Sequence, residues 1–425
     1  MTGRRPDGNA HPSQPAQRVR LLYLTPEPWP TFRADIAALF GKHLPNNGVD
    51  TDLVTVVASR EPSKPWGGGA AILCNAGRGQ AGKYLRMFFH FASVLLRADW
   101  RRYDAVQVRD MPLAALLALL LARWHGRPFF YWMSYPMSEG FIALARERGL
   151  GAGWMRFLFP WLRGHLGKFL LRKVLLPRAD HVFVQSEQMK RELVASGVDP
   201  DRMTPVPMGV DLSALDAGSG TVVRDPRFDG RRVIGYLGTL ERPRRIEVLF
   251  EMLQHLRQQW PHVLLLIVGD TTDVSQRERL RALAAEAGVN DLIVWAGWVP
   301  IDQAWALLRN SEIGLSPVPR SSLLDVGSPT KVVEYLALNL PVICNDNPDQ
   351  AEVVGVTGAG LCVPYTGSDF AEAVSNLLAL DLHERKRMAL RGRAYVEAHR
   401  DYRVVAAQLA AAYRAVLHPD AGAYA

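Results

Sequence analysis

Short apolar runs alternate with longer stretches of helical spacing along this chain from residue 19 onward. This alternation is typical of a parallel, doubly wound sheet with helices on both faces. The first group of predicted strands covers residues 19–25, 51–57, 103–109, 129–134 and 181–185. After a polar interval, a second group covers residues 233–237, 263–268, 292–296, 313–316, 341–344 and 360–363. The pattern therefore predicts an α/β protein with two Rossmann-like halves that face each other across a cleft.

Interruptions of this pattern divide the chain into segments. Residues 1–17 carry charge, proline and glycine without an apolar segment, so we expect a disordered tail and not a signal peptide. Residues 18–207 and 231–382 form the two predicted domains, joined by a polar linker at 208–230. Residues 383–418 have a helical pattern and no strand of their own, so we expect them to pack back toward the first domain and brace both halves, with a tail at 419–425.

The composition is that of an ordinary folded protein, with 425 residues, of which 48% are apolar and 22% are charged. The formal net charge of +8 favours polyanions, phosphorylated ligands or an anionic membrane surface as partners. The three cysteines lack CxxC spacing, which argues against a disulfide framework or a zinc site. The longest apolar run, at 111–122, falls short of the about 20 residues that cross a bilayer, and it predicts a buried helix.

A polar turn precedes the predicted helix at residues 332–338. The free N–H groups and positive dipole end of such a helix attract anions, and Ser328, Thr330 and Lys331 add donors. Pro329 suits the helix start because no N–H group is needed there. The turn therefore predicts an anion site.

Glu334 lies one helical turn beyond this anion site. A carboxylate just behind a phosphate site is suited to the hydroxyl pair of a ribose. The alternative is a surface carboxylate paired with Lys331 three residues earlier. We favour the ribose interpretation because the preceding turn is rich in donors and the following apolar strand fixes the helix beside the sheet.

A second glycine-containing turn follows the first strand of the second domain. Gly238 and Thr239 end that strand, and Arg242, Arg244 and Arg245 come next. Arginine suits pyrophosphate because its planar fork donates paired, charge-assisted hydrogen bonds, and open α/β sheets bind ligands at this edge. The alternative is a solvated basic turn. The dinucleotide fingerprint G-x-G-x-x-G is absent here, which argues against NAD.

Two stretches of the first domain, at residues 83–102 and 139–173, combine aromatic and leucine residues with arginine and lysine. Such a combination can lie in a membrane interface, where anionic headgroups attract the basic residues. The alternative is that the aromatic residues pack on the sheet. Because two such stretches occur in the same domain, we favour membrane contact. Nucleic acid is disfavoured because no recognised nucleic-acid module accompanies the charge.

Motifs in both halves give the chain a family resemblance over residues 19–417. They comprise ADHVFVQSE at 179–187, MGVD at 208–211, YLGTL at 236–240, VGD at 268–270, GWV at 297–299 and SPTKVVEY at 328–335. With these motifs in this order, the chain resembles the retaining, family-4-like glycosyltransferases of the GT-B fold, also called glycosyltransferases group 1.

The resemblance implies a nucleotide-diphosphate sugar held mainly by the second domain and an acceptor held by the first. It implies that the 242–245 turn and Lys331 neutralise the diphosphate, that Arg244 and Lys331 stabilise the leaving group, and that Glu334 holds the ribose hydroxyls. No metal or other cofactor is required. Together with the basic aromatic stretches, it suggests a lipid-linked saccharide acceptor in bacterial surface polysaccharide synthesis, on the cytoplasmic face of the plasma membrane.

The chain departs from the family pattern at the sugar end of the donor. Many members have a second glutamate eight positions before the ribose-binding one, where this chain has Val326; Asp325 is the neighbouring candidate to replace it. Many members have a histidine at the end of the strand 129–134, where this chain has Ser134. The glycine pair of many first loops is replaced by residues 30–33.

These departures keep two alternatives open. One is a non-catalytic partner subunit with a degenerate sugar site, which the two replaced residues favour. The other is a sugar-nucleotide epimerase or hydrolase on the same fold, which would need an acid/base pair beside the sugar. No motif in the sequence supplies such a pair.

Overall fold

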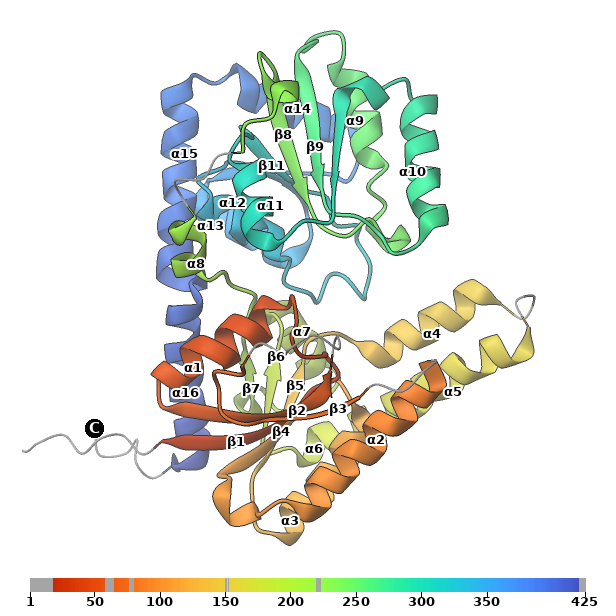
Figure 1. Ribbon diagram of the computed structural model, residues 1–425, viewed down its shortest axis with the longest axis vertical. Helices are drawn as coiled ribbons and strands as arrows, with labels where there is room; N and C mark the ends of the chain where they lie inside the picture. The colour runs from red at the N-terminus through yellow and green to blue at the C-terminus, as the bar shows by residue number, and fades with distance from the viewer. Residues whose placement is uncertain are drawn as a thin grey trace, which may run out of the picture.

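The computed structural model describes residues 18–57, 65–75, 80–149, 151, 153–218 and 223–419 (Figure 1). The predicted tails at 1–17 and 419–425, the latter apart from residue 419, lie outside the described residues, as do residues 219–222 of the predicted linker. The described chain folds into two α/β domains stacked along the long axis of the molecule.

The first domain contains a seven-stranded parallel sheet with the order β3-β2-β1-β4-β5-β6-β7. Its strands are β1 Val19–Leu24, β2 Val49–Val57, β3 Ala71–Asn75, β4 Ala105–Arg109, β5 Phe129–Met133, β6 His181–Val184 and β7 Met203–Pro205. All five strands predicted for this half are present. The two unpredicted ones, β3 and β7, lie at the edges; β3 is partly exposed and β7 has three residues and ends at a proline, so neither forms a long apolar run.

The second domain contains a six-stranded parallel sheet with the order β10-β9-β8-β11-β12-β13. Its strands are β8 Arg232–Leu237, β9 Val263–Val268, β10 Ile293–Gly297, β11 Ile313–Ser316, β12 Val342–Asn345 and β13 Gly360–Val363. The predicted bounds of each of these strands agree with the observed bounds to within one or two residues. The order of strands reverses between β1 and β4 in the first sheet and between β8 and β11 in the second. Ligands of open α/β sheets bind at the carboxyl ends of strands at these two reversal points.

Helices cover both faces of each sheet. Those of the first domain are η1 Asp35–His43, α1 Leu44–Asn46, α2 Gln80–Arg97, η2 Trp100–Arg102, α3 Pro112–Trp124, α4 Met137–Arg148, α5 Trp154–Leu170, η4 Leu171–Leu175, α6 Leu176–Arg178, α7 Glu187–Ala195 and η5 Pro200–Arg202. Those that follow are α8 Leu212–Ala217, η6 Pro226–Phe228, η7 Arg242–Arg244, α9 Val248–Leu256, α10 Val274–Glu286, η8 Asn290–Leu292, α11 Ile301–Leu308, α12 Thr330–Ala337, α13 Pro348–Thr357 and α14 Gly367–Ala379. Each sheet thus has a hydrophobic core on each face.

The apolar run at 111–122 forms α3, but only one face of that helix is buried. Ala115, Ala118 and Ala122 pack in the core, whereas Leu113, Leu120 and Trp124 are more than half exposed. The predicted buried helix is therefore present and is buried on the face that packs on the sheet, while its other face is exposed.

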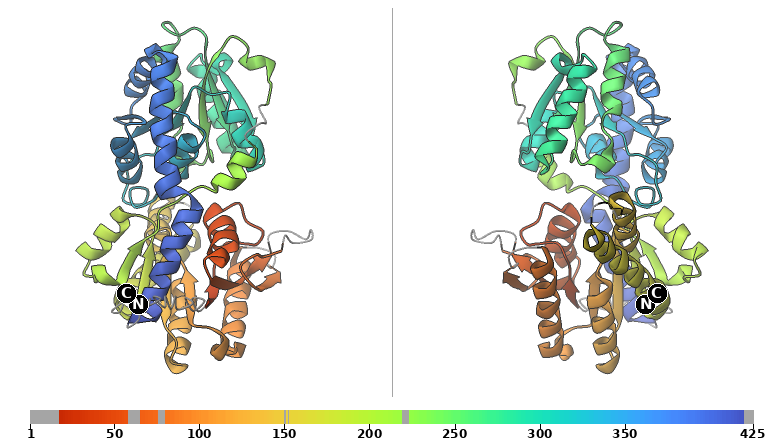
Figure 2. Two further views of the ribbon diagram at one scale, coloured as in Figure 1. Left: turned by 90° about the vertical axis from the view of Figure 1, so that its left-hand side faces the viewer. Right: turned by 90° about the vertical axis from the view of Figure 1, so that its right-hand side faces the viewer.

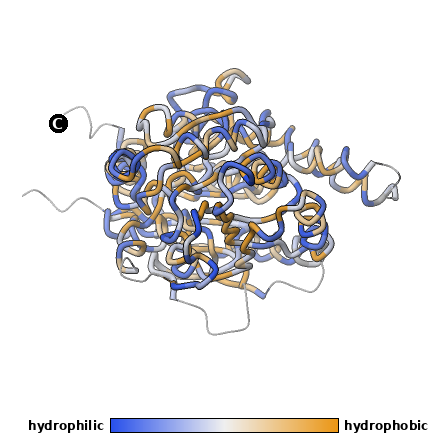
Figure 3. Tube along the Cα trace, turned by 90° about the horizontal axis from the view of Figure 1, so that it is seen from above, coloured by the Kyte–Doolittle hydropathy of each residue, from blue (hydrophilic) through white to orange (hydrophobic). Residues whose placement is uncertain are grey.

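Helices α4 and α5 form a hairpin that projects from the first domain (Figure 1). Seen from above, the hairpin extends away from the body and alternates between hydrophobic and hydrophilic residues (Figure 3). Gly164 permits this packing, since a Cβ atom there would lie 2.6 Å from Ile142 Cγ1 on α4. Much of the hairpin surface therefore remains outside the core of the domain.

The last helices run along both domains, as predicted (Figure 2). Helix α15 Leu382–Tyr395 packs on α12 and α13 of the second domain. It continues through η9 Val396–Arg400 into α16 Tyr402–Leu417, which packs on η1 and α1 of the first domain. There the Tyr413 hydroxyl donates a hydrogen bond of 2.6 Å to Gln107 Oε1. The C-terminal helices therefore brace the two domains.

A buried ion pair lies where this brace crosses between the domains. Arg400 Nη2 donates to Asp349 Oδ1 at 2.9 Å, and both side chains are at most 8% exposed. The Ser328 hydroxyl donates to the other carboxylate oxygen at 2.8 Å and accepts the Met208 N–H at 3.0 Å. These bonds join the C-terminal helices, the linker and the second domain at one point.

Replacing Asp349 should therefore destabilise the protein strongly. Asp349→Ala leaves the Arg400 guanidinium buried and uncompensated, which costs about 3–5 kcal/mol in comparable cases. Asp216→Ala is a matched control because it breaks an ion pair with Arg393 in which the aspartate is half exposed, worth about 0–1 kcal/mol. Thermal melting should show a drop of several degrees for Asp349→Ala and little change for Asp216→Ala. Equal effects would contradict this assignment.

Candidate nucleotide-sugar site

Gly238 directly follows β8 at the reversal point of the second sheet, with a φ of +149°. A Cβ atom at this position would lie 2.7 Å from Lys331 Cε and 3.2 Å from Lys331 Nζ. Glycine is thus needed here both for the backbone conformation and for the approach of the lysine. The two motifs predicted to bind phosphate, one after β8 and one at the start of α12, therefore meet in the structure.

The arginine turn after β8 supplies three cations. Arg242 and Arg245 are exposed and Arg244 is partly buried, with Arg245 in the left-handed backbone region at a φ of +46°. The Tyr365 hydroxyl holds the turn by donating to the Arg245 carbonyl at 2.7 Å. None of the three guanidinium groups forms a salt bridge with any residue that the structure describes. The turn therefore keeps its positive charge available.

Lys331 is 7% exposed and lies with its Nζ atom 5.2 Å from the centre of the Tyr236 ring. Burial, together with the charge of Arg244, lowers the pKa of Lys331 to about 7, and the charge of Glu334 opposes this shift. Within the described chain Lys331 has no salt bridge. Burial and the neighbouring arginine both make the charged form of this lysine unfavourable. A bound anion would reduce that cost.

Glu334 follows on the same helix, where its Oε1 accepts a hydrogen bond of 3.3 Å from Trp305 Nε1. Burial raises the pKa of Glu334 to about 7, opposed by the bond from Trp305, the charge of Lys331 and a hydrogen bond from Thr330. Thr330 is thereby placed next to the carboxylate. Glu334 is partly buried, and within the described chain it forms no salt bridge with Lys331, so the alternative of a surface carboxylate paired with that lysine does not fit.

Ser328 was predicted to donate its hydroxyl to an anion, but the hydroxyl is already used at the domain junction. It contacts Met208, Asp349 and Arg400, and the side chain is 8% exposed. Pro329 precedes the first helical residue of α12, with no side-chain cap on the helix. The structure thus places the backbone at 328–330, and not the Ser328 hydroxyl, beside Lys331.

The loop expected to meet the sugar carries no unengaged acid. Asp325 Oδ1 accepts hydrogen bonds from Arg320 Nε at 2.9 Å and from the Ser321 N–H at 3.3 Å. Val326 is buried in the hydrophobic core of the first domain, and its carbonyl accepts the Ser186 hydroxyl at 2.7 Å. The loop therefore docks on the first domain, and the Asp325 carboxylate is tied to Arg320.

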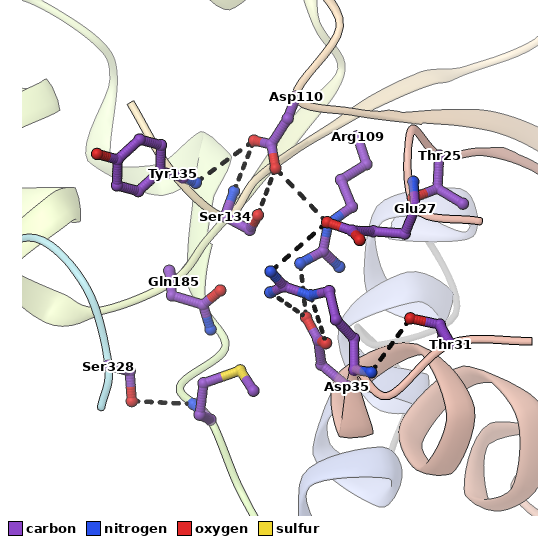
Figure 4. Close-up of polar contacts among 12 residues, drawn as sticks. Thr25, Glu27, Thr31, Asp35, Arg109, Asp110, Ser134, Tyr135, Gln185 and Ser328 are labelled. Atoms are coloured by element: carbon purple, nitrogen blue, oxygen red, sulfur yellow. Dashed lines mark hydrogen bonds and ion pairs between the residues drawn. The ribbon is translucent and has the colours of Figure 1, made fainter. Parts of the chain in front are cut away.

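A group of charged residues in the first domain lies at the carboxyl ends of β1 and β4 and at the start of η1 (Figure 4). This first-domain charge cluster comprises Glu27, Arg33, Asp35, Arg109 and Asp110. Arg109 Nη2 donates to Asp35 Oδ2 at 2.6 Å, and Arg33 donates to both oxygens of the same carboxylate at 3.1 Å. Burial opposes ionisation of Asp35, but Arg109 and Arg33 hold its pKa well below the usual range.

Ser134 meets this cluster through Asp110. The Ser134 N–H donates to Asp110 Oδ1 at 2.8 Å, and the Ser134 hydroxyl donates to Asp110 Oδ2. Burial raises the pKa of Asp110, while Arg109 and the bonds from Ser134 act against this. The residue that stands where many family members have histidine therefore holds a carboxylate.

Electrostatic contacts connect the sites of the two domains. The charge of Arg244 in the second domain acts on the Tyr135 hydroxyl, which follows Ser134 in the first. Asp35 and Glu334 both raise the pKa of the buried Tyr402 hydroxyl at the start of α16, where burial is the main cause. The basic turn and the charge cluster thus face a common region between the sheets.

The sequence did not single out the charge cluster, because its members come from three separate segments and no two form a known motif. One signal was available: Arg109 and Asp110 follow a predicted strand at the same edge as the arginine turn. Parallel strands bring such residues to one edge of a sheet.

Comparison with protein families gives two matches, one in each domain. Residues 34–209 match the model described as glycosyl transferase 4-like domain, and residues 231–380 match the model described as glycosyl transferases group 1. The first match covers most of the first domain and the second covers the sheet that carries the basic turn and α12.

Curated relatives match about half of the chain. The lipopolysaccharide 1,6-galactosyltransferase of Salmonella typhimurium is 24% identical over 206 residues, which are 47% of this chain and 53% of the relative. The D-inositol 3-phosphate glycosyltransferase of Nocardia farcinica is 26% identical over 231 residues, 52% of this chain and 50% of the relative. The chain thus spans about half the length of the curated relatives it matches.

Solved structures share the fold over nearly the whole chain. HepE of Anabaena, solved in complex with UDP, has 13% sequence identity and a TM-score of 0.65, with 93% of this chain and 100% of that one covered. The expected GT-B fold, with two Rossmann-like domains and bracing C-terminal helices, is therefore confirmed.

The lowered pKa of Lys331 predicts proton uptake when an anion binds. Above pH 7.5 a nucleoside diphosphate is fully ionised and the free lysine is largely neutral, so bound diphosphate should restore its proton. Calorimetry at pH 8 should then give binding enthalpies that depend on the ionisation enthalpy of the buffer, with close to one proton taken up. Affinity should fall up to about tenfold per pH unit from 7.5 to 8.5. Lys331→Met should abolish both effects; their persistence in this variant would assign the proton elsewhere.

Proposed function

The chain belongs to the group 1 glycosyl transferases, and we propose that it transfers a sugar, with retention of anomeric configuration, from a nucleotide-diphosphate sugar to a lipid-linked saccharide. The basic turn and α12 hold the donor, and the first domain holds the acceptor. UDP-bound and UDP-glucose-bound structures of the Anabaena neighbour support a nucleotide sugar as ligand.

One observation carries the donor assignment: Lys331 lies one helical turn before Glu334 and within reach of the charge of Arg244, and within the described chain neither Lys331 nor any arginine of the turn forms a salt bridge. Four cations can bind the two negatively charged groups of a diphosphate through charge-assisted hydrogen bonds. Glu334, one helical turn further, can accept hydrogen bonds from both ribose hydroxyls. Gly238 and Thr239 bring the backbone close to the same ligand.

The proposed reaction needs a stabilised leaving group more than a nucleophile on the protein. The bond between the anomeric carbon and the diphosphate breaks, and an acceptor hydroxyl forms the new bond on the same face of the sugar. The hydroxyl proton goes to the departing diphosphate. Arg244, Lys331 and the N–H groups that follow Pro329 stabilise the charge that develops there. Because these cations supply the neutralisation, we propose that no metal ion takes part.

The outer surface of the first domain supports a lipid acceptor. Phe159, Leu162, Leu166 and Phe169 follow each other at helical spacing on α5, and each is between 51% and 59% exposed. Helix α3, which contacts both α2 and α5, adds exposed Leu113, Leu120 and Trp124. Within the described chain, no helix has the length and apolar character needed to cross a membrane.

Basic residues accompany this apolar surface. Arg146, Arg148, Arg156 and Lys173 are exposed on or next to the α4–α5 hairpin, whereas Arg163 stacks between the rings of Tyr84 and Phe141 at 4.1 Å. On α2, Leu85, Phe89 and Leu96 are exposed while Met87, Phe91 and Leu95 pack in the core. Each helix thus has a structural face and an outer face. We propose that the outer faces lie on anionic lipid at the cytoplasmic surface of the plasma membrane.

Removal of the Glu334 carboxylate tests the donor site. The two hydrogen bonds lost with Glu334→Ala involve a charged group, so we expect nucleotide-sugar affinity to fall about 10- to 100-fold. A panel of UDP-, GDP- and dTDP-sugars, read by the rise in melting temperature and then by calorimetry, identifies the ligand for this measurement. Glu286→Ala, an exposed site on α10, serves as control and should bind as the parent does. Unchanged affinity in a folded Glu334→Ala protein would refute the assignment.

Membrane contact is tested with vesicles of stated charge. Replacing Leu162, Leu166 and Phe169 by glutamine should lower binding to vesicles with about 30% phosphatidylglycerol at least tenfold, because the apolar stripe is lost. The parent protein should bind such vesicles less well as salt is raised, since exposed charges are screened.

The matched control replaces three exposed apolar residues of the other domain, Val356, Leu382 and Leu390, by glutamine. This variant should bind vesicles like the parent. Equal loss in both variants, or no loss in the first, would exclude α5 as the contact surface.

A further inference from the structure

Asp110 has a backbone conformation that is uncommon for a residue with a side chain. It directly follows β4 with a φ of +52°, one of three non-glycine residues in the described chain in the left-handed region. Such conformations are strained for residues with a side chain and persist where the surroundings impose them, often at functional sites. Here the Asp110 N–H donates to the Trp132 carbonyl at 3.1 Å, and α3 begins two residues later. The backbone therefore fixes the direction of the Asp110 side chain.

The side chain is buried and still has acceptor positions available. Its carboxylate is 6% exposed, and its close hydrogen bonds come from the N–H and hydroxyl of Ser134. Arg109 Nε lies 3.6 Å from Oδ2, beyond hydrogen-bond distance, and the Tyr135 N–H is at 3.5 Å. An ionised carboxylate offers about four acceptor positions. Asp110 can therefore accept at least one more hydrogen bond.

Two of the other acids near this region are bound by arginine. Asp35 accepts hydrogen bonds from Arg33 and Arg109 through both oxygens, and in the second domain Asp325 accepts one from Arg320. Glu27 lies 3.6 Å from Arg33, as Asp110 does from Arg109, but the Glu27 side chain is 31% exposed. Asp110 is therefore the buried acid of this group that accepts no hydrogen bond from an arginine.

The position of Asp110 matches the sugar end of the proposed donor. It lies at the carboxyl end of β4, at the reversal point of the first sheet, where ligands of open sheets bind. Tyr135, whose N–H contacts Asp110, is close enough to Arg244 for that charge to act on its hydroxyl. Arg244 belongs to the proposed diphosphate site, and the sugar lies next to the diphosphate. Figure 4 shows Asp110 and Ser134 on the side of the first domain that the Ser328 loop approaches.

We propose that Asp110 accepts a hydrogen bond from one hydroxyl of the transferred sugar and so selects the donor sugar, with Ser134 as its positioning residue. This inference rests on the proposed function, since it requires a nucleotide sugar in the basic turn. The acid that the second domain lacks at position 326 is thereby supplied from the first domain.

Binding of two ligands to one variant tests this proposal. Asp110→Asn keeps the size of the side chain and tolerates the left-handed backbone, because asparagine adopts that region more readily than most residues. We expect the variant to bind the nucleotide sugar at least tenfold more weakly than the parent, but the free nucleoside diphosphate within twofold. Asp52→Asn is the matched control, because Asp52 is a buried acid of the same first sheet that binds Tyr103 and Arg20. It should change neither affinity relative to the parent.

Donors that lack one hydroxyl identify the contact. For the deoxy analogue missing the hydroxyl that Asp110 binds, parent and Asp110→Asn should bind alike, whereas the other deoxy analogues should still separate them by at least tenfold. Ser134→Ala should show a smaller loss of the same kind, and Ser134→Thr, which keeps the hydroxyl, should restore binding.

Two results would overturn the proposal while leaving the proposed function intact. In the first, Asp110→Asn weakens nucleoside diphosphate and nucleotide sugar equally, as a structural role would. In the second, it leaves both affinities unchanged. If the parent binds neither nucleoside diphosphates nor any sugar of the UDP, GDP and dTDP panel, the proposed function itself fails, and this inference fails with it.

Discussion

The electrostatic cost of keeping Lys331 buried beside Arg244 is the constraint on which the rest of the site depends. Like charges in a low-dielectric position repel, and burial alone disfavours the charged lysine. The fold nevertheless holds both groups at the carboxyl edge of the second sheet, with Gly238 cleared of a side chain to admit the lysine. On the proposed function, a bound diphosphate would remove this cost. Its removal would favour both binding of the ligand and departure of the leaving group.

The junction between the domains fixes the first domain relative to this edge of the second sheet. The pair of Arg400 and Asp349 fixes the C-terminal brace, and Ser328 links it to the linker at Met208. The same loop continues through Val326, which is buried in the core of the first domain. The start of α12 is thus tied to the first domain by the residues immediately before it, so that the charge cluster and the basic turn share one region.

The fold could be predicted largely from the sequence, because buried parallel strands leave continuous apolar runs. The edge strands β3 and β7 left no such run. The exposed face of α3 could not be predicted, because an apolar segment does not reveal whether a second layer covers it. The donor motifs were recognisable because each is local in sequence. The role of the Ser328 hydroxyl was not, since its partners Met208, Asp349 and Arg400 are distant in the chain. Asp110 was missed for the same reason: its relation to Ser134 appears only when β4 and β5 lie side by side.

Consumption of the identified nucleotide sugar by the purified protein, measured with and without a bacterial membrane-lipid extract, distinguishes a transferase from the alternatives. A transferase with a lipid acceptor should release nucleoside diphosphate rapidly, together with labelled sugar in the lipid fraction, only when the extract is present. Consumption at the same rate without any acceptor would indicate a hydrolase or an epimerase. Binding of the nucleotide sugar with no turnover under either condition would contradict the enzyme assignment and favour a partner subunit.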